Sequence, residues 1–127
     1  MSTPDSAPTV LVVDDDDLQR SLYEEELMDE GYNVITASDG RQALNVAKEQ
    51  KPDLVIMDVN MPVMDGLDTL SRLLEADRGI PVIIHTAYAS YRESFASWSA
   101  DAYIVKNSDL TELKETVKRL LSERAAQ

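Results

Sequence analysis

The chain has 127 residues, and its 12 basic residues stand against 24 acidic ones, which gives a net charge of −12. This length fits one domain, and a hydrophobic content of 43% supplies enough apolar side chains for a core. The charge argues against binding to DNA, RNA or anionic membranes, because those surfaces repel an acidic protein. There is no cysteine and only one histidine, so disulfides, thiol catalysis and histidine-rich metal sites are excluded.

The two ends of the chain predict short tails around one domain. Residues 1–8 are rich in Ser, Thr and Pro, and they lack the basic and apolar regions of a signal peptide. No apolar run approaches the roughly 20 residues that cross a bilayer. We therefore expect a cytoplasmic protein with a flexible tail at 1–8, a domain at 9–124 and a C-terminal tail at 125–127.

Short apolar, β-branched runs alternate along the chain with segments of helical periodicity. In chain order, strands are expected at Thr9–Val13, Asn33–Thr36, Leu54–Met57, Val82–Ile84 and Tyr103–Val105. The helices expected after these strands span 17–30, 40–50, 66–77, 89–98 and 109–124. Continuous rather than alternating apolar runs are typical of strands that are covered on both faces.

Five β-α units of this kind predict a parallel sheet with helices on both faces and right-handed crossovers. The expected fold class is α/β: a flavodoxin-like, doubly wound (βα)5 three-layer sandwich with sheet order 2-1-3-4-5. Gly31 is expected to end the first helix as its C′ residue. Asp109 with Glu112 predicts a capping-box-like start for the last helix.

The residues that follow the strands carry the candidate chemistry, because ligands of such sheets bind beyond the carboxyl ends of the strands. The first strand is followed by four aspartates at 14–17, the third by Asp58, the fourth ends at Thr86 and the fifth precedes Lys106. Several carboxylates in one crevice repel each other unless a cation compensates them. An oxygen-only set favours Mg²⁺ or Mn²⁺, and with the ion bound the site can accept a phosphoryl group.

Simpler interpretations apply to some of these side chains. Asp16 and Asp17 are typical of a helix N-terminus, where the helix dipole favours negative charge. His85 precedes Thr86 and is expected on the opposite face of the sheet, as a buried neutral histidine. Trp98 continues an apolar stripe and is expected to pack at the core or its edge.

Four segments together resemble the motif set of the receiver domains of two-component response regulators. They are Val12-Val13-Asp14-Asp15, the segment Ile56–Gly66 (IMDVNMPVMDG), Thr86-Ala87 and Tyr103-Ile104-Val105-Lys106. The resemblance covers residues 9–124, and the D-x-x-M-P-x-M-D-G pattern within the second segment is highly specific. A stand-alone, chemotaxis-regulator-like domain is the expected form.

The resemblance implies a role for each matching acidic-site residue. Asp58 would be the phosphoacceptor, which takes a phosphoryl group from a histidine kinase or a phosphotransfer protein. Asp15 would bind Mg²⁺ directly, Asp14 would hold it mainly through water, and the backbone carbonyl of Asn60 would complete the coordination, with Asp58 itself as a further ligand. The only implied cofactor is Mg²⁺.

Three further residues would read out the phosphorylation. Thr86 would be the switch hydroxyl that moves onto the phosphoryl oxygen, Tyr103 the aromatic switch and Lys106 the lysine that pairs with the phosphoryl group. The resemblance implies that phosphorylation shifts the face made by residues 89–98, 103–105 and 109–124, which then binds a downstream protein. We expect no direct contact with nucleic acid or membrane, and a monomer or a phosphorylation-dependent dimer.

The sequence departs from the usual receiver pattern beside Lys106, where Asn107 stands in place of the common proline. A trans peptide bond is expected there, because a cis bond before a non-proline residue costs about 2.5–4 kcal/mol. The turn 98–101 also lacks the common glycine, which predicts an unusual output surface.

Other functions remain open from the sequence. Asp14 and Asp16 fit the Asp-x-Asp spacing of a Mg²⁺-dependent haloacid-dehalogenase-like phosphohydrolase, although a cap domain and a late acidic pair are missing. A metal-free interaction module and a receiver module of a longer regulator or hybrid kinase are further alternatives. The preferred interpretation is not an enzyme but a phosphoacceptor that catalyses its own phosphotransfer and dephosphorylation.

Overall fold

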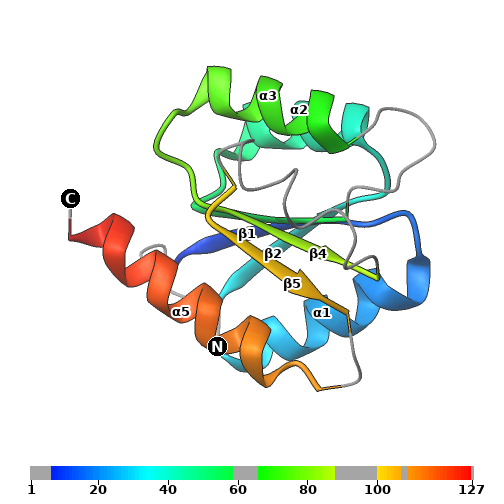
Figure 1. Ribbon diagram of the computed structural model, residues 1–127, viewed down its shortest axis with the longest axis vertical. Helices are drawn as coiled ribbons and strands as arrows, with labels where there is room; N and C mark the ends of the chain where they lie inside the picture. Colours follow the sequence, from blue (N-terminus) through cyan, green and yellow to red (C-terminus); the bar gives the residue numbers. More distant parts are fainter. Residues whose placement is uncertain (1–6, 59–65, 88–99, 107–108, 127) are drawn as a thin grey trace.

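The computed structural model describes residues 7–58, 66–87, 100–106 and 109–126, and Figure 1 shows how their helices and strands are arranged. The strands are β1 (Thr9–Val13), β2 (Asn33–Ala37), β3 (Leu54–Met57), β4 (Val82–Thr86) and β5 (Ala102–Val105). The helices are α1 (Asp17–Asp29), α2 (Gly40–Gln50), α3 (Gly66–Ala76) and α5 (Thr111–Ala125). No helix in these ranges is long and apolar enough to cross a membrane.

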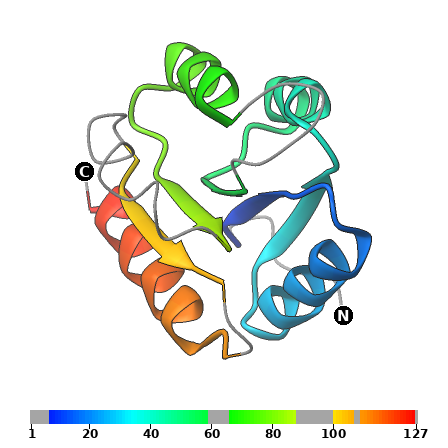
Figure 2. The same cartoon turned by 45° about the vertical axis from the view of Figure 1, so that its right-hand side comes forward.

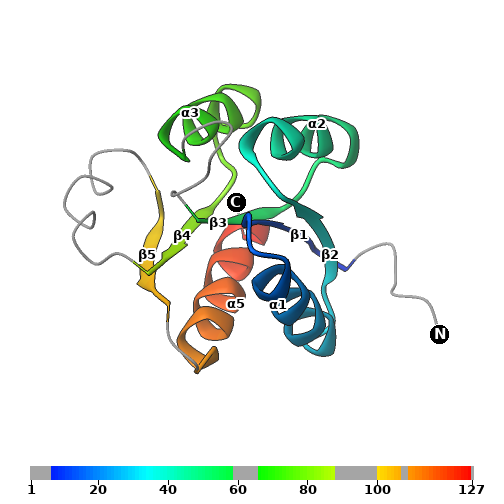
Figure 3. The same ribbon diagram turned by 90° about the vertical axis from the view of Figure 1, so that its right-hand side faces the viewer.

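The five strands form one parallel sheet in the order β2-β1-β3-β4-β5. Helices α2 and α3 cover one face of this sheet, and α1 and α5 cover the other (Figure 3). Figure 2 shows α1 beside β2 and α5 beside β5. The fold-class prediction is therefore confirmed, including the order of the strands.

The core consists of two apolar layers that the sheet separates. Along β1, Val10 and Val12 face the layer of α1 and α5, whereas Leu11 and Val13 face the layer of α2 and α3. All four side chains are buried, which explains why the run is continuously apolar. Burial of each such side chain contributes about 1.5–3 kcal/mol, so β1 stabilises both layers of the core.

At two helix ends, local sequence patterns determine where the helix stops or starts. Gly31 has a φ of 94°, and its N–H donates to Met28 O while Tyr32 N–H donates to Leu27 O. These two bonds are the Schellman motif, so the prediction for Gly31 is confirmed. Asp39 precedes α2 and accepts a 2.8 Å hydrogen bond from Gln42 N, which caps that helix.

The predicted start of the last helix is wrong. α5 begins at Thr111, two residues after the expected position, and Leu110 occupies the N-cap without a side-chain cap bond. Asp109 lies one residue before the cap, and its Oδ1 accepts from Thr111 N at 2.9 Å. Asp109 therefore forms a local turn and not a capping box, because Leu110 is buried and sets the entry of the chain into the helix.

Three strand ends also differ from the expectation. β2 continues through Ala37, β4 continues through His85 and Thr86, and β5 begins one residue earlier, at Ala102. Each extension pairs with a single parallel neighbour: the end of β2 with β1, and the ends of β4 and β5 with each other. The helix expected at 89–98, with Trp98, lies outside the described residues. The same holds for the peptide bond before Asn107 and for residues 1–6 of the expected tail.

Candidate functional site

The acidic residues meet at the carboxyl ends of the two central strands. Val13 and Met57 are paired in the register of β1 and β3, so Asp14 and Asp58, which follow them, leave the sheet side by side. Asp58 N–H donates to Val13 O at 3.0 Å, and Asp14 N–H donates to Ala37 O at 3.1 Å. Main-chain hydrogen bonds thus extend the sheet to both aspartates and fix where their side chains begin.

Lys106 joins the two buried carboxylates. Its Nζ lies 2.7 Å from Asp14 Oδ2 and 2.8 Å from Asp58 Oδ2. Only 1% of Asp14 and 8% of Asp58 is exposed, so both carboxylates are largely removed from water. A charged lysine between them offsets a repulsion that would otherwise cost about 4 kcal/mol at a 4 Å separation and an effective dielectric of 20.

Burial and ion pairing raise the pKa values of both Asp14 and Lys106, for different reasons. Burial raises the pKa of Asp14, and the hydrogen bonds from Lys106 and from Asp16 N–H offset this only in part. For Lys106, burial by itself lowers the pKa, but the hydrogen bonds and charges of Asp14 and Asp58 outweigh it and raise the pKa above its ordinary value. Lys106 is therefore a permanent cation of the site at neutral pH.

Asp15 completes an oxygen cluster at the solvent side. One carboxylate oxygen from each of Asp14, Asp15 and Asp58 lies within 4.8 Å of the others, and Asp15 is exposed. Oxygens on opposite sides of a Mg²⁺ ion are about 4.2 Å apart, since each bond is about 2.1 Å long. The residues present therefore fit a hard divalent cation with little movement, and the exposed side leaves room for its waters.

Two neighbouring residues hold the β1–α1 turn that carries this cluster. Asp16 Oδ1 accepts from Leu18 N at 2.9 Å and from Gln19 N at 3.2 Å, which makes it the N-cap of α1. Arg20 Nη1 donates to Asp14 O at 2.6 Å, and Arg20 Nη2 pairs with the carboxylate of Asp17. The interpretation of Asp16 and Asp17 as helix N-terminal acids is confirmed, whereas sequence reasoning missed Arg20, the first cation after the acidic run.

The two predicted switch residues lie on neighbouring strands. Thr86 is fully buried at the end of β4, and its carbonyl accepts from Lys106 N at 2.7 Å. Tyr103 is partly buried on β5 opposite Ile84 and packs against the layer of α2 and α3. Asn60, the predicted carbonyl ligand, lies outside the described residues.

A buried aromatic contact under the site was not foreseen. The rings of Tyr23 and His85 lie 5.2 Å apart at 54°, on the side of the sheet covered by α1 and α5. His85 is 2% exposed, and burial followed by the charge of Lys106 lowers its pKa to about 4. It is a neutral histidine in the core, as predicted. Within the described ranges, Tyr23 Oη and His85 Nδ1 have no hydrogen-bond partner.

The comparisons with known proteins agree on one family. The family model for the response regulator receiver domain matches residues 10–118. The chain belongs to the receiver domain family of response regulators. The acidic cluster and Lys106 of this receiver domain lie on the segments that resemble the family motifs.

Relatives of two sizes match this receiver domain. The transcriptional regulatory protein PrrA of Mycobacterium leprae is 41% identical over 128 residues, which are 99% of this chain but 55% of the relative. The chain thus spans about half the length of this and other curated relatives it matches. Sporulation initiation phosphotransferase F of Bacillus subtilis is 36% identical over 114 residues, which are 88% of this chain and 92% of the relative.

Solved receiver structures share the same fold. The response regulator TrrA of Thermotoga maritima, in complex with Mg²⁺-BeF, superposes with a TM-score of 0.84 at 42% identity and covers 89% of this chain and 98% of that one. A CheY-like receiver domain of Methanospirillum hungatei gives a TM-score of 0.89 at 30% identity, and the match covers 95% of this chain and 98% of that one. The family match and these structures give no support to the phosphohydrolase alternative.

Proposed function

We propose that this receiver domain is a phosphorylation-dependent switch in which Asp58 accepts the phosphoryl group. The observation that carries the proposal is the position of the Asp58 carboxylate, which belongs to the oxygen cluster with Asp14 and Asp15 and also pairs with the ammonium of Lys106. A carboxylate is already deprotonated at neutral pH, so it needs no general base to act as a nucleophile. The donor would be a histidine kinase or a phosphotransfer protein, in the cytoplasm where phosphohistidine donors act.

The transfer itself needs few groups. An oxygen of Asp58 attacks the phosphorus atom, an O–P bond forms, and the P–N bond to the donor imidazole breaks with its electron pair left on that imidazole, which takes up a proton. Before the transfer, Lys106 Nζ donates a hydrogen bond to Asp58. From this position it would pair with an oxygen of the incoming phosphoryl group. The protein thus contributes position and charge, and the domain would catalyse its own phosphorylation in this sense.

Mg²⁺ is the cofactor that this site fits. Asp14, Asp15, Asp58 and the backbone carbonyl of Asn60 would hold it, and bound Mg²⁺ would neutralise charge on the carboxylates and phosphoryl oxygens. In support of this assignment, the TrrA structure is a complex with Mg²⁺-BeF. Without the ion, Lys106 offsets the charge of two of the acids, Asp14 and Asp58.

The output step would run through Thr86 and Tyr103. The carbonyl of Thr86 accepts a hydrogen bond from Lys106 N, which connects the ends of β4 and β5. Tyr103 lies on β5, the strand that pairs with β4. We propose that the phosphoryl group draws the Thr86 hydroxyl toward it and that Tyr103 follows. A pre-existing equilibrium of the output face, which includes β5 and α5, would then shift toward the partner-binding state.

The phosphohydrolase alternative also conflicts with the geometry of Asp16. In an Asp-x-Asp enzyme the second aspartate must be available to the substrate. Here Asp16 accepts two backbone hydrogen bonds at the start of α1, which is a structural task that explains its presence. The receiver assignment needs no further role for it.

Replacement of Asp58 tests the proposal. Asp58→Asn should abolish Mg²⁺-dependent labelling by acetyl phosphate or by a phosphohistidine donor, because an amide cannot act as the nucleophile. Asp29→Asn, which changes an exposed aspartate at the end of α1, is the matched control and should label normally. Full labelling of Asp58→Asn would overturn the assignment, provided that both variants give the unfolding curve of a folded domain.

A further inference from the structure

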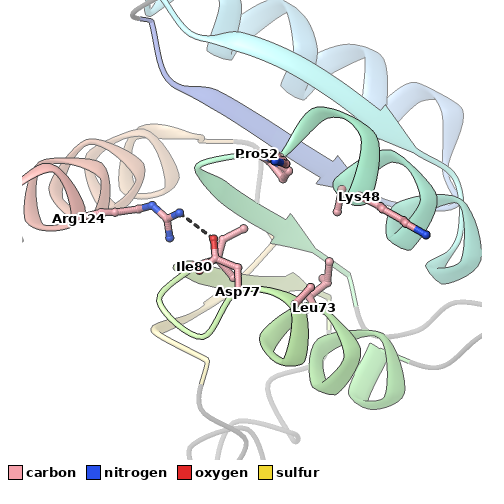
Figure 4. Close-up of a pocket in the computed structure, with 9 residues that line it drawn as sticks. Lys48, Pro52, Leu73, Asp77, Ile80 and Arg124 are labelled. Carbon is pink, nitrogen blue, oxygen red and sulfur yellow. Dashed lines mark hydrogen bonds and ion pairs between the residues drawn. The ribbon is translucent and has the colours of Figure 1, made fainter.

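A pocket lies at the opposite end of the sheet from the acidic cluster. It occupies about 490 Å³ where α2, α3 and α5 end, next to the residues that precede β3 and β4 (Figure 4). Such a volume falls within the range of about 300–1,000 Å³ that is typical of small-molecule sites. The receiver function proposed above does not use this pocket.

The pocket combines an apolar lining with positive charge. Its apolar lining is Ala47, Pro52, Leu73, Ala76 and Ile80. The charged residues of the lining are the three cations Lys48, Lys51 and Arg124 and the single carboxylate of Asp77, which leaves a local excess of two positive charges. In a chain of net charge −12, this local excess makes the pocket unlike the protein as a whole.

Arg124 enters the pocket from the far layer of the sandwich. It reaches from the end of α5 to the residues that precede β3 and β4, and its Nη2 lies 2.8 Å from Asp77 Oδ2 (Figure 4). Asp77 uses its other oxygen to accept from Gly79 N at 3.1 Å. Among the described residues, Arg124 pairs only with Asp77, so most N–H groups of its guanidinium remain available to an anion.

We propose that this pocket binds a small organic anion with an apolar body. The body would lie against Leu73, Pro52 and Ile80, where burial of apolar surface supplies the affinity. A carboxylate, sulfonate or phosphate head would pair with Arg124 and with a lysine, and these cations would select the sign of the charge and orient the ligand. The head competes with Asp77 for Arg124, so the ligand would loosen the bond between α5 and the α3–β4 turn.

Three probes separate the parts of this proposal. Anilinonaphthalene sulfonate carries both an apolar body and an anionic head, its analogue N-phenylnaphthylamine carries the body alone, and inorganic phosphate carries the charge alone. We expect saturable binding of the sulfonate by fluorescence, at least about threefold tighter than that of the neutral analogue, and no displacement by an equal concentration of phosphate. Amide resonances of residues 47–51 and 76–80 should shift in the same titration.

Charge variants predict changes of opposite sign. Lys48→Gln with Lys51→Gln should weaken binding of the sulfonate by about threefold to fivefold for each charge removed. Asp77→Asn keeps an oxygen for Gly79 N but removes the competing charge, so it should strengthen binding by a similar factor. Arg41→Gln with Lys118→Gln removes two exposed cations outside the pocket and should leave binding unchanged.

Each contrary outcome overturns a stated part. Absence of saturable sulfonate binding, or resonance shifts confined to other residues, would overturn the site. Equal affinity for the neutral analogue, or an equal loss in the Arg41 and Lys118 variant, would overturn recognition of the anion. Displacement by inorganic phosphate alone would overturn the requirement for an apolar body.

Discussion

Lys106 Nζ donates to Asp14 Oδ2 across 2.7 Å, although the two residues lie 92 positions apart in the chain. β3 and β4 lie between β1 and β5, and the contact exists because β1 and β5 are parallel and end on the same side of the sheet. It places a permanent cation in a site whose function requires negative groups to approach one another.

Loss of Lys106 should destabilise the domain and strengthen its hold on Mg²⁺. Lys106→Met leaves Asp14 and Asp58 buried without a counter-charge, and we expect the free energy of unfolding to fall by about 3 kcal/mol. Millimolar Mg²⁺ should restore part of this loss, because the ion binds the folded state and no longer competes with the ammonium. Urea unfolding with and without Mg²⁺ measures both effects.

The control for this change is Lys114→Met. Lys114 Nζ lies 3.1 Å from Glu26 on a partly exposed surface, so the same charge is removed where it contributes less than about 1 kcal/mol. Equal losses in the two variants would show that Lys106 has no special part in the charge balance of the site.

Asp15→Asn should separate metal binding from stability. Asp15 is exposed, so its replacement should change the free energy of unfolding by no more than about 0.5 kcal/mol. If Asp15 is a direct ligand, as proposed, Mg²⁺ affinity should fall by at least the roughly 10–100-fold that loss of an outer-shell partner costs. Calorimetric titration with Mg²⁺ decides the matter, with Asp29→Asn as the control; a normal affinity for Asp15→Asn would refute its role as a ligand.

The buried histidine predicts a pH dependence of stability. The folded-state pKa of His85 is lowered to about 4 from 6.5, so the unfolded chain binds the proton more readily as the pH falls. Its contribution is fully present above pH 6.5 and declines as the pH falls toward 4. At pH 5 the loss amounts to about 2 kcal/mol relative to pH 8.

His85→Val tests this dependence by removing the titrating ring. Urea unfolding at pH 8 and pH 5 should show a loss of stability about 2 kcal/mol smaller in the variant than in the parent chain. Carboxylates titrate in both proteins, so the difference between the two losses isolates His85. An identical pH slope would mean that the ring is protonated in the folded state.

Asp16 distinguishes a helix cap from a catalytic acid. Asp16→Ser keeps a side-chain oxygen for Leu18 N and Gln19 N, so stability should change by less than about 0.5 kcal/mol, whereas Asp16→Ala should cost about 1 kcal/mol. Phosphoryl labelling should persist in both variants. Loss of labelling in the well-folded serine variant would show that Asp16 takes part in the chemistry and is not only a helix cap.

Several features of the fold and site were predictable because they depend on local pattern. The continuous apolar run at Thr9–Val13 determined a strand covered on both faces, and Gly31 determined the end of α1 through its positive φ. The rule that ligands gather at the carboxyl ends of parallel strands then placed Asp14, Asp58 and Lys106 together. Those inferences needed only the period of burial, a single backbone preference and the direction of the strands.

Other features were decided only by tertiary structure. The start of α5 moved because Leu110 is buried, and burial of one side chain overrides the capping preference of Asp109. The contact of Tyr23 with His85 and the bond of Arg124 to Asp77 join residues on different elements. Such contacts depend on how far each crossover carries its helix around the sheet, and a sequence period reports which face is buried but not which distant side chain lies against it.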